Sequence, residues 1–244
     1  MCEITAVTSG KGGSGKTMVA SNLAAVLAMQ GKRVLLIDMN AGFRNLDICL
    51  GMESQIIFDI ADVIEGICPI RRALIRDSRF EALYLLSASQ NPEKGNIQPP
   101  HMKALCKKLS LKFDHIIIDV PGGLGLEWKT AVAAANHAIV VMTQDYVAIR
   151  DSDTLDMKLQ ESGVRNRCVL LNRMRGDYAA NKNLPSLGEI ADALRMRIIG
   201  IIQEDDNIHI AMNNGIPVVC KNENYIRTNF LNIEQRLFFG ECYE

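Results

Sequence analysis

Eight residues near the start of the chain limit its possible folds more than any other feature. They read GKGGSGKT from Gly10 to Thr17 and match G-x-x-x-x-G-K-[ST], the pattern of a phosphate-binding loop. Residues 3–9 have the apolar character of a buried strand, and after the loop apolar residues recur at helical spacing until Gly31. A strand, loop and helix in this order direct the amide groups at the helix start toward bound phosphate. The pattern therefore predicts a P-loop protein that binds a nucleotide.

The residue types of the loop, together with a second motif, predict Mg²⁺ beside the nucleotide. Lys16 can reach the β- and γ-phosphates, and the hydroxyl of Thr17 can ligate the metal ion. Residues 116–123, IIIDVPGG, form an apolar strand that ends in Asp119, the position of a Walker B aspartate that holds Mg²⁺ directly or through water. The glycines that follow let this segment move when the γ-phosphate leaves. A strand-end aspartate alone is a weak indication, but together with the loop it predicts a Mg²⁺-nucleotide site.

The composition is ordinary and excludes several classes of function. Of the 244 residues 48% are hydrophobic and 23% charged, and the net charge is −1. There is neither the basic excess of a nucleic-acid-binding protein nor the acidic excess of a disordered tail. The seven cysteines are scattered without C-x-x-C, and the four histidines lack zinc-ligand spacing. We therefore expect reduced thiols, and Mg²⁺ held through the nucleotide as the metal.

The sequence shows no signal for export or for a membrane span. The first residues lead directly into the first expected strand, so we expect no signal peptide. Apolar runs stay well short of the ~20 residues that a membrane-spanning helix needs. We expect a cytoplasmic protein, and attachment to the inner face of the membrane through partners stays open.

The order of the expected elements predicts the fold class. Strand-like and helical runs alternate along the chain, which is typical of a mostly parallel, twisted sheet with helices on both faces. Without a repeat or linker to divide it, residues 1–244 are expected to form one α/β domain, a P-loop NTPase. The expected strands are residues 3–9, 33–38, 83–87, 115–119, 138–142, 168–171 and 198–202. The expected helices are residues 59–66, 70–76, 99–109, 129–135, 152–161, 186–194 and 225–239, with a helical turn at 208–213.

A second lysine in the loop indicates a family. Lys11 directly follows the first glycine and gives the sequence KGGSGKT, which resembles the deviant Walker A loop of the MinD/ParA family of ATPases. The resemblance implies an ATP-dependent homodimer in which Lys11 reaches the nucleotide of the partner protomer. The alternative is a solvated lysine on a loop.

Further segments extend the resemblance, with the MinD branch of this family, over about residues 3–240. GFRNLD at residues 42–47 resembles its switch I segment. The other similar segments are DIADVIEG at 59–66, LLSASQ at 85–90, DVPGG at 119–123, IRDSD at 149–153 and IQED at 202–205. The resemblance implies an ATP-hydrolysing switch that acts with a partner protein in placing the division septum.

The resemblance also implies a set of site residues. Asn172 and Arg173 end a strand at the adenine-reading position, where an amide can both donate to and accept from the base, although a polar strand end would look the same. The expected metal ligands are Thr17, Asp38 and Asp119. The expected contacts to ATP or ADP are Gly10, Lys11, Gly12, Gly13, Ser14, Gly15, Lys16, Thr17, Met18, Asn172 and Arg173.

The chain departs from the family pattern at Asn40. Relatives have D-x-D here, with the second aspartate near the attacking water, whereas this chain has Asp38-Met39-Asn40. An amide can still position water, but it lacks the charge and basicity of a carboxylate. We therefore take Lys11, Lys16 and Asn40 as the candidate catalytic residues and expect slow turnover. Gly122 and Gly125 replace the usual alanine and glutamate of switch II, which is expected to loosen that loop and alter partner specificity.

Two further clusters could suggest a membrane or DNA partner. An apolar stripe is formed by Phe230, Leu231, Ile233, Leu237 and Phe238. The family places its basic, membrane-binding segment after its last core helix, and this stripe matches the core helix itself. We therefore expect the stripe to pack on the sheet and the protein to bind anionic membranes weakly; the alternative is that the stripe contacts the membrane. The basic cluster consists of Arg71, Arg72, Arg76 and Arg79. It is expected to put three guanidiniums on one helix face, but aromatic residues do not interleave, so we expect a solvated face and no DNA partner.

Three functions stay open from the sequence alone. The first is a septum-placing switch of the MinD type. The second is another positioning ATPase of the same family, acting on flagellar number, pili or DNA partitioning. The third is a nucleotide-binding module that barely hydrolyses ATP because of Asn40.

Overall fold

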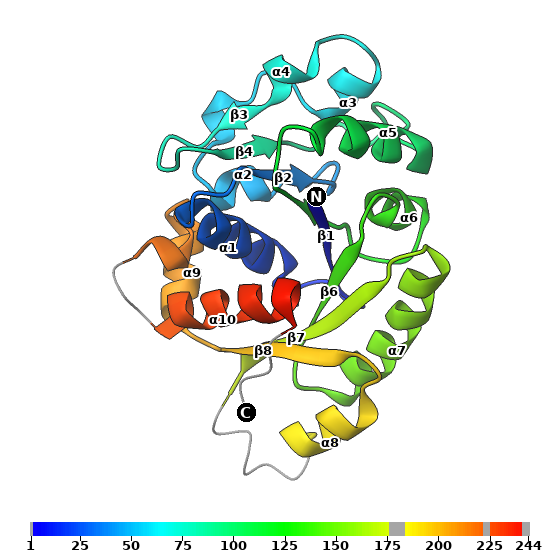
Figure 1. Ribbon diagram of the computed structural model, residues 1–244, viewed down its shortest axis with the longest axis vertical. Helices are drawn as coiled ribbons and strands as arrows, with labels where there is room; N and C mark the ends of the chain where they lie inside the picture. The colour runs from blue at the N-terminus through cyan, green and yellow to red at the C-terminus, as the bar shows by residue number, and fades with distance from the viewer. Residues whose placement is uncertain (1, 176–183, 222–224, 241–244) are drawn as a thin grey trace.

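The computed structural model describes residues 2–175, 184–221 and 225–240 and has an eight-stranded sheet at its centre (Figure 1). The strand order is β3-β4-β2-β5-β1-β6-β7-β8, and every neighbouring pair is parallel except β3 with β4. The strands are β1 (Glu3–Thr8), β2 (Val34–Asp38), β3 (Ile75–Arg76), β4 (Leu83–Leu86), β5 (His115–Asp119), β6 (His137–Met142), β7 (Asn166–Met174) and β8 (Arg197–Gln203). The predicted α/β class with a mostly parallel sheet is confirmed.

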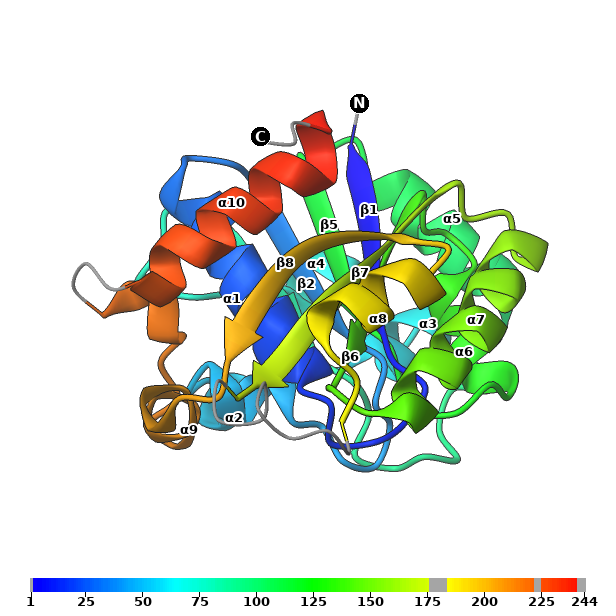
Figure 2. The same ribbon diagram turned by 90° about the horizontal axis from the view of Figure 1, so that it is seen from below.

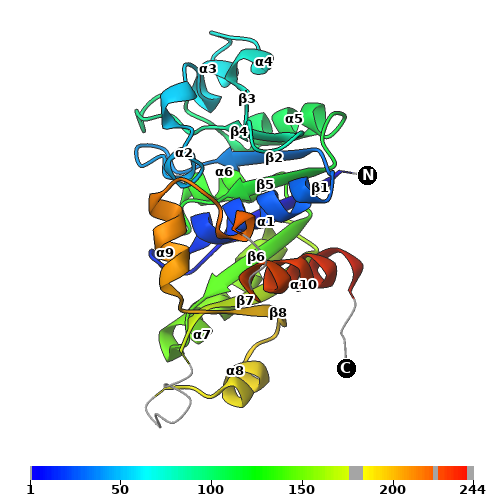
Figure 3. The same ribbon diagram turned by 90° about the vertical axis from the view of Figure 1, so that its left-hand side faces the viewer.

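Helices cover both faces of this sheet (Figure 3). One face carries α1 (Lys16–Met29) and α10 (Tyr225–Phe239), with the 3₁₀ turn Val218–Cys220 beside them. Short helices α2 (Leu46–Cys49) and α9 (Asp206–Asn213) contact each other next to α1, and a second 3₁₀ turn spans Glu53–Gln55. The other helices are α3 (Ile60–Ile64), α4 (Ile70–Ala73), α5 (Pro99–Leu109), α6 (Leu126–Val132), α7 (Tyr146–Glu161) and α8 (Leu187–Ala193). All six bury side chains in the core cluster of the opposite face.

Helix α1 is buried on all sides, which explains why its sequence from Met18 to Ala28 is apolar apart from Ser21 and Asn22. Residues 18–28 are all buried, because the helix packs on β1, β2 and β5 and is flanked by α2 and α10. A helix that is hydrophobic all round belongs in a core. The first turn of this central helix follows the P-loop, so the loop is supported by a rigid element.

Helix α10 buries the apolar stripe that the sequence predicts for it. Phe230, Ile233 and Leu237 are 0%, 1% and 3% exposed, and they join the core cluster of α1 and β8. Leu231 and Phe238 pack against the same cluster while partly exposed. The expectation that this stripe faces the sheet is confirmed. Among the residues that the structure describes, every helix is too short or too polar to span a bilayer.

Several predicted boundaries were wrong. Residues 70–76 do not form one helix, because α4 ends at Ala73 and Ile75–Arg76 pair antiparallel with β4. Helix α7 begins at Tyr146 rather than Ser152, because the carboxylate of Asp145 caps it by accepting from the amide of Ala148 at 2.8 Å. Helix α6 spans Leu126–Val132, three residues before the expected range.

The basic cluster is not a helix face. Arg71 and Arg72 belong to α4, and Arg72 stacks on the ring of Phe58 at 4.7 Å. Arg76 lies in β3, and Arg79 lies beyond that strand in an ion pair with Asp77. The four arginines are therefore divided among three environments, and the predicted row of three guanidiniums on one helix is wrong.

Candidate nucleotide-binding site

The phosphate-binding loop lies between the carboxyl end of β1 and the start of α1. Gly13 and Gly15 have φ angles of 77° and 95°, which residues with a side chain rarely adopt, and Gly15 is the cap of α1. A Cβ atom on Gly15 would lie 2.2 Å from Nδ2 of Asn172, which donates to the carbonyl oxygen of Ser14 at 2.7 Å. The amide of Asn172 therefore supports the loop from below, and only glycine fits at position 15.

The side chain of Lys16 lies within the loop and is largely withdrawn from water. Its Nζ donates to Oγ of Ser9 at 3.0 Å. Burial lowers the pKa of Lys16, while the charge of Asp119 raises it. An anion in the loop would favour the charged form of this lysine in the same way.

Two buried carboxylates stand side by side below the loop. Asp38 and Asp119 end the neighbouring strands β2 and β5, are paired in register and are both fully buried. Burial raises the pKa of Asp119 to about 7, and the charge of Asp38 contributes to the rise. Burial also raises the pKa of Asp38, against which Asn40 and Leu46 act by donating hydrogen bonds.

Thr17 and Asn40 complete this cluster. The hydroxyl of Thr17 donates to Oδ2 of Asp119 at 2.7 Å. Nδ2 of Asn40 donates to the same oxygen and to Oδ1 of Asp38, at 3.1 Å in each case. The motifs and the family resemblance predict Thr17, Asp38, Asn40 and Asp119 as site residues, and the structure brings all four together.

The donor set of this cluster fits Mg²⁺. Two carboxylates and one hydroxyl supply the oxygen ligands that this ion prefers. In the part of the chain that the structure describes, Oδ1 of Asp119 is buried and has no hydrogen-bond partner. A buried carboxylate oxygen without a partner is costly, and a cation would satisfy it. Thr17, Asp38 and Asp119 could therefore hold the metal, directly or through water.

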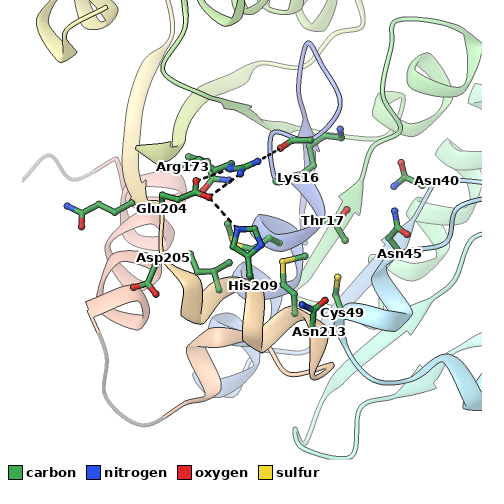
Figure 4. Close-up of a pocket in the computed structure, with 17 residues that line it drawn as sticks. Lys16, Thr17, Asn40, Asn45, Cys49, Arg173, Glu204, Asp205, His209 and Asn213 are labelled. Carbon is green, nitrogen blue, oxygen red and sulfur yellow. Dashed lines mark hydrogen bonds and ion pairs between the residues drawn. The ribbon is translucent and has the colours of Figure 1, made fainter. Parts of the chain in front are cut away.

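A cavity of about 450 Å³ opens beside the loop and the carboxyl ends of β7 and β8 (Figure 4). In Figure 2 the arrowheads of these two strands point toward α2 and α9. Its volume lies in the range of small-molecule sites. The residues that line it are Gly13, Gly15, Lys16, Thr17, Met18, Asn40, Asn45, Cys49, Asn172, Arg173, Gln203, Glu204, Asp205, Ile208, His209, Met212 and Asn213. The cavity thus combines the loop with residues of α2 and α9.

Not every predicted loop contact lines this cavity. Gly10, Lys11 and Ser14 border a much smaller recess beside the start of α7 instead. Gly12 lies in open space, since nothing would come within 4 Å of a Cβ atom placed on it. Asp38 and Asp119 lie beneath the cavity floor, which Thr17 and Asn40 form.

Arg173 belongs to an ion-pair network at the mouth of the cavity (Figure 4). Its guanidinium binds Glu204 through two hydrogen bonds of 2.8 and 3.0 Å and reaches the carbonyl oxygen of Gly13 at 3.4 Å. His209 contacts the same carboxylate at 3.4 Å. The segment with Glu204 and Asp205 resembles the family in sequence, but these two residues were not predicted to belong to the site. The polar residues that follow strand β8 were the available signal, since ligands bind at the carboxyl ends of such strands.

Lys11 points toward α7 and away from the cavity. Its Nζ pairs with Oδ2 of Asp145 at 2.7 Å, and Thr143 donates to the same oxygen at 2.7 Å. The other oxygen of Asp145 caps α7. Within the protomer, Lys11 is therefore bound to the helix that follows β6.

The glycine loop, the paired aspartates and the strand order define a P-loop nucleotide-binding protein of the parallel α/β class. A family model described as an AAA domain matches residues 2–162. The chain is 38% identical over 239 residues to the septum site-determining protein MinD of Bacillus subtilis, covering 97% of this chain and 89% of that protein. The chain belongs to the MinD family of ATPases.

Solved structures agree with this membership. A chain of a MinC:MinD cell division protein complex from Aquifex aeolicus superposes with a TM-score of 0.90 at 34% identity, covering 100% of this chain and 98% of that chain. MinD from Pyrococcus horikoshii, solved with Mg-ADP, has a TM-score of 0.87 at 28% identity, covering 98% and 96%. The similarity therefore extends through the whole fold, including the segments that form the cavity.

Proposed function

We propose that this protein binds ATP and ADP with Mg²⁺ in the cavity, hydrolyses ATP slowly, and acts as an ATP-dependent dimerisation switch in placing the division septum. The observation that carries the proposal is the oxygen cluster of Thr17, Asp38 and Asp119 directly beneath a glycine loop. Family membership supports the septum role, and the Pyrococcus relative was solved with Mg-ADP. One domain formed by residues 1–244 is part of the proposal.

In this proposal the loop binds the phosphates of the nucleotide, and the strand ends bind its base. Backbone amides from Gly13 to Thr17 and the ammonium of Lys16 bind the phosphates. The remaining loop contacts within the protomer are Gly10 and Gly12, Lys11 is proposed to contact the nucleotide of the partner protomer, and Met18 follows in α1. The amide of Asn172 and the backbone at Arg173 lie where the base would be read, at the carboxyl end of β7. Mg²⁺, when bound, offsets negative charge on the phosphates and on the two buried aspartates.

For hydrolysis, the chain has to hold a water molecule in line with the terminal phosphate. Asn40 lies at the cavity floor beside the aspartates. Both N–H groups of its amide are bonded to them, so its Oδ1 is the atom that can accept a hydrogen bond from that water. Because an amide is not a base, its contribution is positioning rather than proton removal. Lys16 stabilises charge on the phosphates from its own protomer, and Lys11 is proposed to do so from the partner protomer.

The partners and the location follow from the same relatives. A structural neighbour was solved as a MinC:MinD complex, and we propose a cell-division partner protein for this chain as well. Cytoplasmic residence, with attachment to the membrane through partners, is part of the proposal. The burial of the α10 stripe argues against its use as a membrane anchor, and the separation of the four arginines argues against a DNA partner.

A second candidate function is a nucleotide-binding module with little hydrolysis. The observation that favours it is that Nδ2 of Asn40 is bonded to both aspartates, which turns the amide nitrogen toward the metal ligands. Turnover by the purified protein separates the two candidates. Another positioning role within the family is the remaining alternative, and co-sedimentation with liposomes and with DNA tests it.

Replacement of Lys16 by alanine tests the proposal itself. We expect Lys16→Ala to abolish measurable binding of Mg-ADP, because a charge-assisted contact to two phosphates is lost in a partly buried site. Calorimetric titration of wild type and variant measures the loss. Lys32→Ala, an exposed lysine beyond the far end of α1, is the matched control and should bind as wild type does. Wild-type affinity in Lys16→Ala would contradict the assignment of this loop.

A further inference from the structure

The guanidinium of Arg79 lies outside the cavity but is bonded to two of the helices that line it. Nη1 donates to the carbonyl oxygen of Gly215, just beyond α9, at 2.7 Å. Nη2 donates to the carbonyl oxygen of Leu50, just beyond α2, also at 2.7 Å. Carbonyl groups at the end of a helix carry partial negative charge and lack partners within the helix. One side chain therefore satisfies the ends of both helices.

The two helix ends touch at this point through glycines. A Cβ atom on Gly215 would lie 2.6 Å from Cα of Gly51, and a Cβ atom on Gly51 would lie 3.2 Å from the carbonyl oxygen of Gly215. Both residues have positive φ angles, of 65° and 62°. Backbone-to-backbone contact of this kind leaves no room for a side chain. The spacing between α2 and α9 is therefore set by this contact and by Arg79 beside it.

Arg79 is itself anchored to the edge of the sheet. Asp77 accepts from Nε at 2.9 Å and from Nη2 at 2.6 Å, and its carboxylate is 3% exposed. The amide of Asp77 donates to the carbonyl oxygen of Leu83, where β4 begins. A planar guanidinium held by a bidentate carboxylate has a fixed orientation. The hairpin of β3 and β4 thus presents a rigid donor group to both helix ends.

Helices α2 and α9 have different positions relative to a bound nucleotide. Helix α2 is tied to the metal cluster, because the amide of Leu46 donates to Oδ2 of Asp38 at 3.2 Å. Helix α9 contributes Ile208, His209 and Met212 to the wall beside the ends of β7 and β8. When the loop binds the phosphates, the base and sugar of the nucleotide lie against the wall that α9 forms. A shift of α9 would therefore change the base half of the cavity and leave the phosphate half in place.

We infer that Arg79 is a positioning residue for the base half of the nucleotide: it holds α9 against α2 and so sets the width of the cavity there. The inference rests on the proposed function, since it assumes that a nucleotide occupies the cavity. Its consequence is that Arg79 contributes to the affinity for an adenine nucleotide without touching it. The phosphate part of the same ligand should be insensitive to Arg79.

Binding of ADP and of pyrophosphate, each with Mg²⁺, tests this inference by calorimetry. Arg79→Lys keeps the charge but cannot bond Asp77 and two carbonyl groups in one plane. We expect it to weaken ADP binding by about tenfold, within the usual size of coupling between two sites, and to leave pyrophosphate binding unchanged. Gly215→Ala, with Arg79 intact, forces the helix ends apart and should give the same difference between the two ligands.

The control and the contrary outcomes separate this inference from the proposed function. Arg33→Lys changes another bidentate arginine, paired with Asp114 at the amino ends of β2 and β5, and should leave both affinities unchanged. Equal losses of ADP and pyrophosphate affinity, or no loss in either variant, would overturn the positioning role. If Arg79→Lys did not fold, Gly215→Ala would decide. A wild-type protein that did not bind ADP would contradict the proposed function instead.

Discussion

At the scale of single residues, Asn40 is the group that joins the two buried aspartates. Burial, and to a smaller extent the neighbouring charge of Asp38, raise the pKa of Asp119 to about 7, because both disfavour a second negative charge in this position. The amide nitrogen of Asn40, 3.1 Å from an oxygen of each, offsets part of that repulsion. An aspartate at position 40 would place a third carboxylate beside the first two.

Asn40→Asp is therefore expected to act in two directions. With saturating Mg²⁺, a carboxylate near the attacking water should accelerate hydrolysis. General-base assistance typically raises a rate by ~10²–10⁴-fold. In phosphoryl transfer the gain is smaller, because the loose transition state depends little on a base. Without metal, the added charge should lower the melting temperature. Single-turnover hydrolysis and thermal unfolding with EDTA measure the two effects.

Asn40→Ala is the comparison for this prediction, because it removes the amide without adding charge. It should hydrolyse ATP more slowly than wild type, since nothing then positions the water. Equal single-turnover rates for wild type and Asn40→Asp would show that position 40 does not limit the chemistry. The proposal of slow turnover would then be dropped.

The residues of the site differ in how far a sequence can reveal them. Lys16, Thr17 and Asp119 belong to motifs whose spacing follows from the chemistry of phosphate and Mg²⁺. Arg79 could not be found in this way, because its two carbonyl partners lie 29 and 136 positions away and become neighbours only through the Gly51–Gly215 contact. Its basic neighbours in the sequence suggested a helix face that does not exist.

At the scale of elements, strongly apolar runs were predicted well and short elements were not. Strand β5 and helix α10 match their expected ranges, since burial on both sides or on one stripe leaves a clear pattern. Strand β3 has only two residues, which is too short for any periodicity. Helix α7 begins with Tyr146 and Val147, which are 56% and 52% exposed, so its first turn lacks the pattern of a buried face.

Helix α10 provides the prediction at this scale. Leu237 is 3% exposed, and its side chain packs in the core cluster of the face that α1 covers. Leu237→Glu should lower the free energy of unfolding by about 2–5 kcal/mol, because the change removes a buried aliphatic group and buries a charge. Urea unfolding measures the loss, and Leu111→Glu, at a leucine that is 83% exposed, is the control.

The alternative for α10 is a membrane-facing helix. If that were correct, Leu237→Glu would unfold as wild type does and would lose ATP-dependent binding to anionic liposomes. The structure supports the opposite order of effects, a loss of stability without a specific loss of liposome binding.

At the scale of the whole molecule, the sheet order brings segments from distant parts of the chain to one edge. The carboxyl ends of four strands lie there. Asp38 ends β2, Asp119 ends β5, the phosphate-binding loop follows β1, and Asn172 lies near the end of β7. The same edge presents the pair of Lys11 and Asp145. Exposed apolar side chains lie nearby in sequence, with Phe43 81% exposed in the segment that resembles switch I. A face that combines a charged pair with exposed apolar side chains is suited to contact with a second copy of the chain.

Dimerisation through this face would require Lys11 to leave Asp145. The two side chains are 45% and 29% exposed, and ion pairs so close to water typically contribute about 0–1 kcal/mol. A phosphate of the partner's nucleotide, in a site closed to water by the dimer, would bind the ammonium more strongly. The ion pair is therefore weak enough for Lys11 to leave Asp145 for the partner's phosphate when ATP is bound. Without ATP, the same pair holds Lys11 in place.

We therefore expect Lys11→Ala to prevent the ATP-dependent dimer and to leave ADP binding to the monomer nearly unchanged. The reason is that Lys11 does not line the cavity of its own protomer, so its loss removes a contact only across the interface. Light scattering with chromatography in ATP and in ADP measures the dimer, and calorimetry measures ADP affinity. Lys108→Ala, at an exposed lysine of α5, is the control and should dimerise as wild type does. A dimer that formed equally well with ADP, or without Lys11, would contradict the action of this lysine across the interface. If Lys11→Ala lost ADP affinity as well as the dimer, Lys11 would belong to the site of its own protomer.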